Sequence, residues 1–127
     1  NVASTAAFQP GPGMAVYFAS KAYVLSFTEA LDYELKRQGA HATALCPGIT
    51  ATAMFDRAIR NNARVAELPT FVVGDVREVA MAGYRACMAG ATITVPGAFN
   101  RAASVAGRAT PKWLLRRIAG AVGRRML

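Results

Sequence analysis

Two short apolar segments, each closed by a Pro-Gly pair, restrict what this chain can fold into more than any other feature. Residues 41–46 (HATALC) precede Pro47-Gly48, and residues 92–95 (TITV) precede Pro96-Gly97. Short apolar runs that stop at Pro and Gly are typical of strands followed by turns. A segment with helical spacing lies between them, and such alternation favours a parallel sheet covered by helices. The sequence therefore predicts the α/β fold class.

Two segments have the apolar spacing of a helix. Residues 15–37 place apolar side chains at intervals of three and four, and Gly39 follows as a helix end. Asp75 predicts the N-cap of a second helix that runs to about Met88. Glu78 stands three residues after this cap, as in a capping box. Both segments have the length of ordinary globular helices.

The remaining segments of the body are less regular, and one expected element is missing. Asn1–Ser4 has the character of a strand end, residues 9–13 (QPGPG) that of a loop, and residues 49–74 are mixed, with short helical pieces expected at 53–64. A doubly wound sheet that binds a dinucleotide carries a Gly-rich phosphate loop after its first strand. This chain contains no such loop. We therefore interpret it as the C-terminal half of a larger Rossmann-like domain.

The positive charge is concentrated at the C-terminal end. The net charge is +8, and residues 101–127 supply +7 of it through seven Lys and Arg with no acid. We expect two parts, a body at 1–100 and a basic extension at 101–127. With 127 residues and 54% hydrophobic side chains, the chain is predicted to be folded rather than disordered. It shows neither a transmembrane run nor a signal-peptide pattern, which favours a cytoplasmic location.

The cysteines and the single histidine do not form a metal-ligand pattern. Cys46 and Cys87 lie in a strand-like and a helix-like run, and their spacing fits no zinc motif. We interpret both as reduced core residues in a reducing compartment. His41 has no second ligand at a suitable spacing, so we expect a surface residue that opens a strand. No metal site is predicted.

Three polar side chains stand where an α/β sheet places its ligand. Ser4 ends a strand, and Tyr17 and Lys21 are one helical turn apart on the following helix. Ligands of such sheets bind at the carboxyl ends of the strands. A free phenol has a pKa of about 10, so an acid/base tyrosine needs a nearby cation that favours the phenolate. Taken singly, each residue is equally compatible with a solvated helix or an ordinary turn; the ordered set favours a site.

The same set carries a resemblance to a known family. The segments NVASTAAF, VYFASKAYVLSFTEALDYEL and ATALCPGITATAMF contain a Ser, a Tyr-x-x-x-Lys 13 residues later, and a Pro-Gly-x-x-x-Thr element after the next strand. This arrangement resembles the catalytic half of the short-chain dehydrogenase/reductase family, over about residues 1–97. The resemblance implies an oxidoreductase that interconverts a carbonyl and an alcohol.

The resemblance also implies a role for each matching residue. Ser4 would orient the substrate oxygen, Tyr17 would be the acid/base, and Lys21 would bind the nicotinamide ribose and favour the phenolate. The nicotinamide carboxamide would be held by a turn and one hydroxyl: Pro47, Gly48, Ile49 and Thr52. The implied cofactor is NAD or NADP, with the resemblance slightly favouring NADP.

Further implications concern partners and what the chain lacks. Residues 53–74 would form a substrate loop, whose apolar character suggests a lipophilic small-molecule carbonyl or alcohol. The helix at 15–37 is similar to one that packs in family dimers, which implies a homo-oligomer. The family's Gly-rich loop, its NAD- or NADP-selecting residue and its upstream catalytic Asn have no counterpart here. The chain alone is therefore expected to bind cofactor poorly and to be inactive.

The sequence of the basic extension is compatible with more than one role. Residues 111–127 (PKWLLRRIAGAVGRRML) have an amphipathic, cationic pattern that could lie on a membrane surface or dock on the body or on a partner subunit. Nucleic-acid binding is not expected, because interleaved aromatic residues are absent. Two alternatives to the oxidoreductase stay open. One is a non-redox epimerase or dehydratase of the same fold, and the other is a non-catalytic domain that works through its cationic tail.

Overall fold

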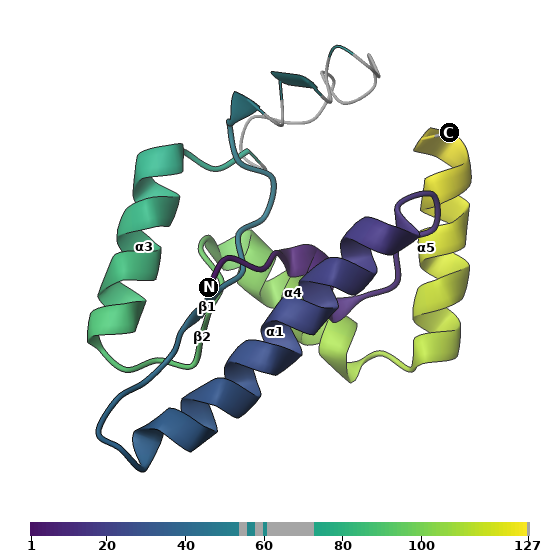
Figure 1. Cartoon of the computed structure of the whole chain (residues 1–127). Coiled ribbons are helices and arrows are strands. Elements are labelled where there is room, and N and C mark those ends of the chain that lie inside the picture. Colours follow the sequence, from purple (N-terminus) through teal and green to yellow (C-terminus); the bar gives the residue numbers. More distant parts are fainter. Residues whose placement is uncertain (54–55, 58–59, 61–72, 127) are drawn as a thin grey trace.

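The α/β class is confirmed by a computed structural model, which describes residues 1–53, 56–57, 60 and 73–126. Its helices and strands follow in the order η1 (Thr5–Phe8), α1 (Ala15–Lys36), β1 (Ala44–Leu45), α3 (Val76–Met88), β2 (Ile93–Thr94), α4 (Ala98–Ala109) and α5 (Lys112–Met126). Figure 1 shows β1 and β2 at the centre, with α1 and α3 on either side and α5 apart at the C-terminal end.

The sheet is parallel, as the sequence predicts. Strand β1 pairs with β2 in the register Ala44 to Ile93 and Leu45 to Thr94. On its other edge Leu45 forms a parallel bridge with Val2, so the strand expected at Asn1–Ser4 contributes one bridge residue. The carboxyl ends of three segments therefore meet along one edge of the sheet.

Both strands are shorter than predicted, and side-chain bonding gives the reason for β1. The backbone N–H of Ala42 donates to Asp32 Oδ1, 3.1 Å away, and the hydroxyl of Thr43 donates to the carbonyl of Ala91. The backbone N–H of Ala42 is therefore bonded to a side chain and is not available to extend the ladder before Ala44. At the other end Pro47 has no N–H to donate, so the regular pairing stops there.

Helices α1 and α3 cover opposite faces of the sheet. Leu25 of α1 packs with Ala44 and Cys46 in the buried core. On the other face, Gly83 of α3 lies so close that an added Cβ would be 2.8 Å from a methyl carbon of Leu45. Since Leu45 lies between Ala44 and Cys46 in a strand, these contacts are on alternate sides of the sheet. The two-sided cover predicted for a parallel sheet is present.

The predicted helix ends agree with the structure to within a residue or two. Helix α1 spans 15–36 against the predicted 15–37, and α3 begins directly after Asp75, whose side chain accepts a hydrogen bond from Glu78 N at 3.0 Å. Helix α5 matches the amphipathic segment expected at 111–127. The helical pieces expected at 53–64 lie mostly outside the described residues, as does most of the loop expected at 53–74.

Helix α4 was not anticipated from the sequence. It begins after Gly97, whose φ of +86° suits glycine, and it has no side-chain N-cap bond, so the usual sequence signal for a helix start is absent. Residue 101 lies inside this helix, and the proposed change from body to extension at 100/101 thus falls within one helical segment. The division into 1–100 and 101–127 stays a prediction.

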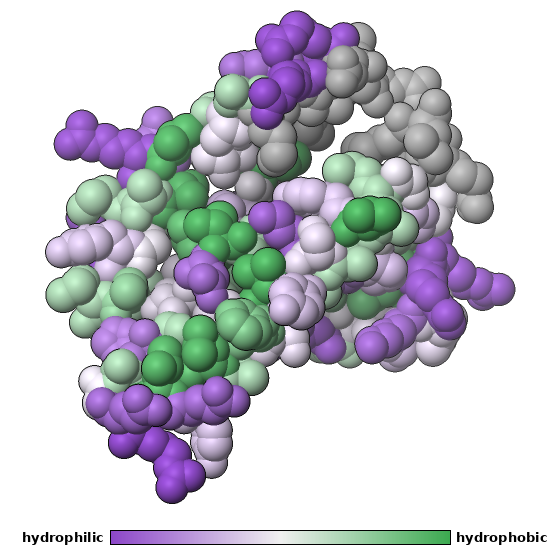
Figure 2. All heavy atoms as spheres, viewed as in Figure 1, coloured by the Kyte–Doolittle hydropathy of each residue, from purple (hydrophilic) through white to green (hydrophobic). Residues whose placement is uncertain are grey.

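The face that α1 presents to the sheet is more polar than its apolar pattern suggests. Thr28 and Asp32 are buried with Leu25, whereas Val16 and Tyr23 are 85% and 69% exposed. Figure 2 shows apolar surface reaching solvent across the middle of this side of the molecule. The spacing of apolar residues therefore predicted the helix but not which of its faces is packed.

The two thiols differ, which corrects the prediction that both are core residues. Both are free, but only Cys46 is buried; Cys87 is exposed. Burial raises the pKa of the Cys46 thiol to about 11, so it stays protonated at neutral pH. Cys87 belongs to a helix that has no fully buried residue, which explains its exposure. His41 is exposed, as expected, and its Nε2 lies 2.7 Å from the carbonyl oxygen of Cys87.

Within the described residues, no helix is both long and apolar enough to cross a bilayer. A surface association of α5 with a membrane is a separate matter and stays a prediction.

Asp32 is the residue that joins α1 to both strands. Its carboxylate accepts hydrogen bonds from the N–H of Ala42 before β1 and, at 2.5 Å, from the hydroxyl of Thr92 before β2. It also forms an ion pair with Lys36 at 2.7 Å. The bonds from Lys36 and Thr92 hold the pKa of Asp32 at about 2, below its ordinary 3.8. A depressed carboxyl pKa contributes stability above pH 3.8, and this contribution is lost as the pH falls through 2.

We therefore expect Asp32→Asn to lower the urea midpoint of unfolding clearly at pH 6, where the parent holds the charged network. The difference between parent and variant should shrink as the pH falls from about 4 to 2, because the Asp32 carboxyl takes up a proton below pH 3.8 in the unfolded parent but only near 2 in the folded parent. Urea titrations across this range test it, with Glu34→Gln on the exposed side of α1 as the control. A difference that stays constant with pH would contradict the assigned role.

Candidate active site

Ser4 lies at the carboxyl edge of the sheet and is almost fully buried. Its Oγ accepts a hydrogen bond from the N–H of Ala6 at 3.1 Å and so caps the first turn of η1. The same oxygen donates to the carbonyl of Pro47 at 3.5 Å, a long contact that engages the hydroxyl proton weakly. The hydroxyl proton can therefore be redirected to another acceptor at this edge without breaking a strong bond.

Tyr17 and Lys21 occupy successive turns at the start of α1. The ammonium of Lys21 lies 5.8 Å from the centre of the Tyr17 ring, within the range of a cation–π contact. It also donates a hydrogen bond to the carbonyl of Val2 at 3.2 Å. Val2 is two residues before Ser4, so this bond ties the helix to the segment that carries the serine. The phenol of Tyr17 is half-buried and has no hydrogen-bond partner among the described residues.

The turn after β1 is fixed at both ends by backbone bonds. The carbonyl of Pro47 accepts from Thr5 N at 2.9 Å, which joins this turn to η1. The carbonyl of Ile49 accepts from Gly74 N at 2.8 Å, and Ala51 N donates to Gly74 O at 3.1 Å. Thr52 follows at the start of the next helical residues, and its carbonyl accepts from Asp56 N. This part of the turn is thus held in one conformation.

These contacts bring the residues singled out from the sequence to one edge of the sheet. Ser4 touches Pro47 directly, and Lys21 reaches both the ring of Tyr17 and the strand that leads to Ser4. Thr52 lies further along the same turn segment. What each residue does at this edge stays a prediction.

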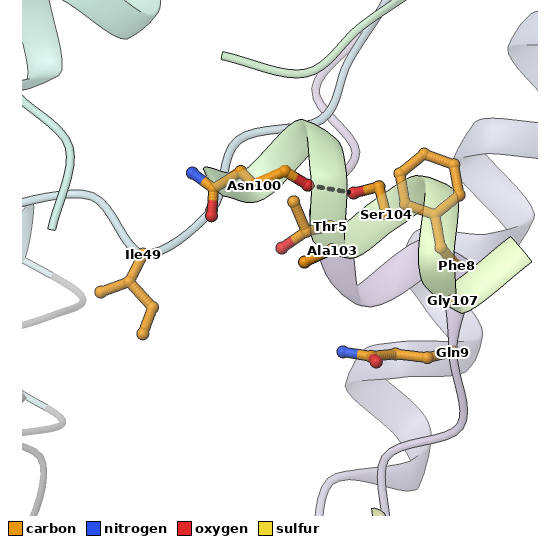
Figure 3. Close-up of a pocket in the computed structure, with 9 residues that line it drawn as sticks. Thr5, Phe8, Gln9, Ile49, Asn100, Ala103, Ser104 and Gly107 are labelled. Carbon is orange, nitrogen blue, oxygen red and sulfur yellow. Dashed lines mark hydrogen bonds between the residues drawn. The ribbon is translucent and has the colours of Figure 1, made fainter. Parts of the chain in front are cut away.

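A small cavity opens beside this edge and uses residues that sequence reasoning missed. Its volume is about 190 Å³, and η1, the turn after β1 and α4 enclose it. In Figure 3, Ile49 lies on one side of the cavity, and Asn100 and Ser104 of α4 lie across from it together with Thr5, Phe8 and Gln9. Gln9 and Asn100 are its amide side chains. A signal for Asn100 was available, since it follows the Pro96-Gly97 turn by three residues at the carboxyl end of a strand.

The donors on this edge fit one end of a dinucleotide. Gly48 has no side chain of its own, and an added Cβ there would meet the side chain of Asn100 at 2.5 Å, so the backbone of this turn lies directly against that amide. Lys21 offers an ammonium that can bind ribose hydroxyls. The sequence holds no Gly-rich loop for the phosphates. The residues present therefore fit the nicotinamide–ribose end, and only that end.

Comparisons with known proteins point to one family of enzymes. Residues 1–63 match the family model described as short chain dehydrogenase. An uncharacterized oxidoreductase of Staphylococcus epidermidis is 41% identical over 54 residues, which cover 42% of this chain and 24% of that protein. A 3-oxoacyl-[acyl-carrier-protein] reductase of Rickettsia prowazekii is 32% identical over 84 residues, covering 65% of this chain and 35% of the reductase.

A solved structure matches along the whole chain. It is a short chain dehydrogenase from Burkholderia cenocepacia in complex with NADP, 29% identical, with a TM-score of 0.67. The match covers 100% of this chain and 47% of that one. The chain therefore spans less than half the length of this structure and about a third or less of the curated relatives named above.

Proposed function

Because the chain belongs to the short-chain dehydrogenase/reductase family, we propose that it is the catalytic half of an NAD(P)-dependent oxidoreductase. The reaction is the interconversion of a carbonyl and an alcohol on a small-molecule substrate. One observation carries this proposal: Lys21 bonds to the strand that leads to Ser4, while its ammonium lies 5.8 Å from the ring of Tyr17. These contacts place the ammonium of Lys21 near a phenol ring and near the segment that carries a serine, which supports the proposal.

The proposed roles follow from the chemistry of each side chain. Tyr17 gives a proton to the carbonyl oxygen in reduction and takes it back in oxidation, through its phenol oxygen. Ser4 donates a hydrogen bond to the same substrate oxygen, for which its weakly engaged hydroxyl proton is suited. Lys21 places positive charge beside the phenol and binds the ribose hydroxyls.

The cofactor contact is assigned to the turn after β1. The backbone of Pro47, Gly48 and Ile49, with the hydroxyl of Thr52, would hold the nicotinamide carboxamide. A nicotinamide bound there supplies hydride transfer. The NADP in the solved relative supports NADP for this chain as well. The phosphates and adenosine would be held by the other half of the domain, so residues 1–127 alone are expected to be inactive.

Two partner assignments belong to the same proposal. The exposed apolar residues of α1, among them Val16, Tyr23 and Phe27, support packing against a second subunit. Exposed Trp113 and Ile118 on the basic helix α5 are compatible with either a partner subunit or a membrane surface.

Activity of the complete polypeptide that contains this chain tests the proposal. We expect it to oxidise NADPH or NADH in proportion to the loss of an added apolar aldehyde or ketone. Residues 1–127 alone should show no turnover under the same conditions. The absorbance of the reduced nicotinamide gives the rate, and chromatography gives the product. Conversion of a substrate without net change of cofactor would contradict the oxidoreductase and favour the epimerase or dehydratase.

A further inference from the structure

Helix α4 contacts the turn that the proposed function assigns to the cofactor. The contact is made by Asn100, which lies in the first turn of α4 and lines the cavity in Figure 3. An added Cβ on Gly48 would lie 2.5 Å from both terminal atoms of the Asn100 amide. The backbone of Gly48 therefore rests directly on this amide, with no side chain between them.

Asn100 is itself held in place by bonds at two points. Its Nδ2 donates to the carbonyl of Pro96 at 3.1 Å, which fixes the amide across the turn that follows β2. Its backbone carbonyl accepts a hydrogen bond from the hydroxyl of Ser104, a residue that is only 7% exposed. Because a short amide side chain bonded in this way has few alternative rotamers, it provides a rigid support.

We propose that Asn100 is a positioning residue for the cofactor: it supports Gly48 from behind and so sets where the Pro47–Ile49 turn presents its backbone. This inference rests on the proposed function, since it assumes that the turn holds the nicotinamide. It adds a residue from the C-terminal part of the chain to the control of cofactor affinity. Ile49 and Asn100 line the same cavity, so displacement of the Asn100 amide would also change the shape of the cavity beside the turn.

The test uses the complete polypeptide and NADPH or NADH as the probe. We expect Asn100→Ala to raise the Kd for the reduced cofactor about tenfold, because the turn loses its support. At saturating cofactor, kcat should stay within about twofold, since no group at the reacting atoms is changed. Val105→Ala is the matched control, as Val105 is on the same helix, 61% exposed and outside the cavity. Its Kd should equal that of the parent.

A second pair of variants separates positioning from general destabilisation. Gly48→Ala should also raise Kd about tenfold, because its Cβ displaces the Asn100 amide. In Gly48→Ala/Asn100→Ala the space for that Cβ is restored, so the effects should be strongly non-additive and Kd should stay near that of either single variant. Thermal unfolding shows whether each variant is folded, and Asn100→Ser replaces Asn100→Ala if the latter is not.

The possible results separate a wrong role for Asn100 from a wrong proposed function. An unchanged Kd in folded Asn100→Ala, or additive effects that reach about a hundredfold in the double variant, would overturn the role of Asn100. If the parent itself binds neither cofactor, the proposed function fails, and the inference with it. In another outcome the parent binds cofactor and turns over while Asn100→Ala has the same Kd. That result leaves the proposed function unaffected and overturns only the role of Asn100.

Discussion

Replacing Tyr17 by Phe in the complete polypeptide is expected to reduce turnover about a thousandfold while leaving cofactor affinity within about twofold. The substitution removes one oxygen and keeps the ring, so the edge contact with Phe18 and the position of Lys21 near the ring are preserved. Only the group that exchanges the proton is lost. Steady-state rates and a cofactor titration measure the two quantities separately.

The helix provides a matched control for this experiment. Tyr33→Phe removes the same oxygen from an exposed tyrosine of α1, and it should leave both turnover and affinity unchanged. Activity of Tyr17→Phe within a few-fold of the parent would remove Tyr17 from the role of acid/base. A parallel loss in Tyr33→Phe would show that the effect comes from the helix and not from the site.

Replacing Lys21 by Met has the second largest expected effect. Unlike Tyr17→Phe, it should change both turnover and cofactor affinity. Turnover should fall about a hundredfold and the Kd for cofactor should rise about tenfold, because one ammonium is assigned both to the phenol and to the ribose. The change also removes the hydrogen bond to the carbonyl of Val2, which ties α1 to the strand before Ser4. The contrast with Tyr17→Phe, which spares affinity, is the diagnostic result.

Lys112→Met on the basic helix α5 serves as the control for loss of one positive charge. It should leave both constants unchanged, since Lys112 is not among the residues assigned to the site. If Lys21→Met lowers turnover but not affinity, the assignment of Lys21 to the ribose is wrong. If neither changes, Lys21 is a surface cation that contributes only to packing.

The sequence predicted well those features that depend on neighbouring residues. The start of α3 could be read from Asp75 and Glu78, because an N-cap bond forms within one turn. The parallel sheet could be read from two apolar runs that each stop at Pro-Gly. The grouping of Ser4, Tyr17 and Lys21 could be expected because strand ends and helix starts meet at one edge of such a sheet.

Features that depend on distant residues were not predictable in the same way. Asp32 looks like an ordinary charged position in an amphipathic helix, yet its partners include Thr92, sixty residues away. Helix α4 starts at a glycine without a side-chain cap, so no local signal marks it. The support of Gly48 by Asn100 joins two turns that are adjacent only because β1 and β2 pair. Tertiary packing determines all three.

The contacts of Ser4 restrict how this position can change in evolution. One oxygen both caps η1, by accepting from Ala6, and holds the proton proposed for the substrate. Aspartate or asparagine would preserve the cap but remove the hydroxyl, and alanine would lose both. Threonine alone among the common caps keeps an acceptor and a hydroxyl donor. Orthologues that keep the activity should therefore vary at position 4 only between serine and threonine, whatever substrate their neighbouring loops have come to accept.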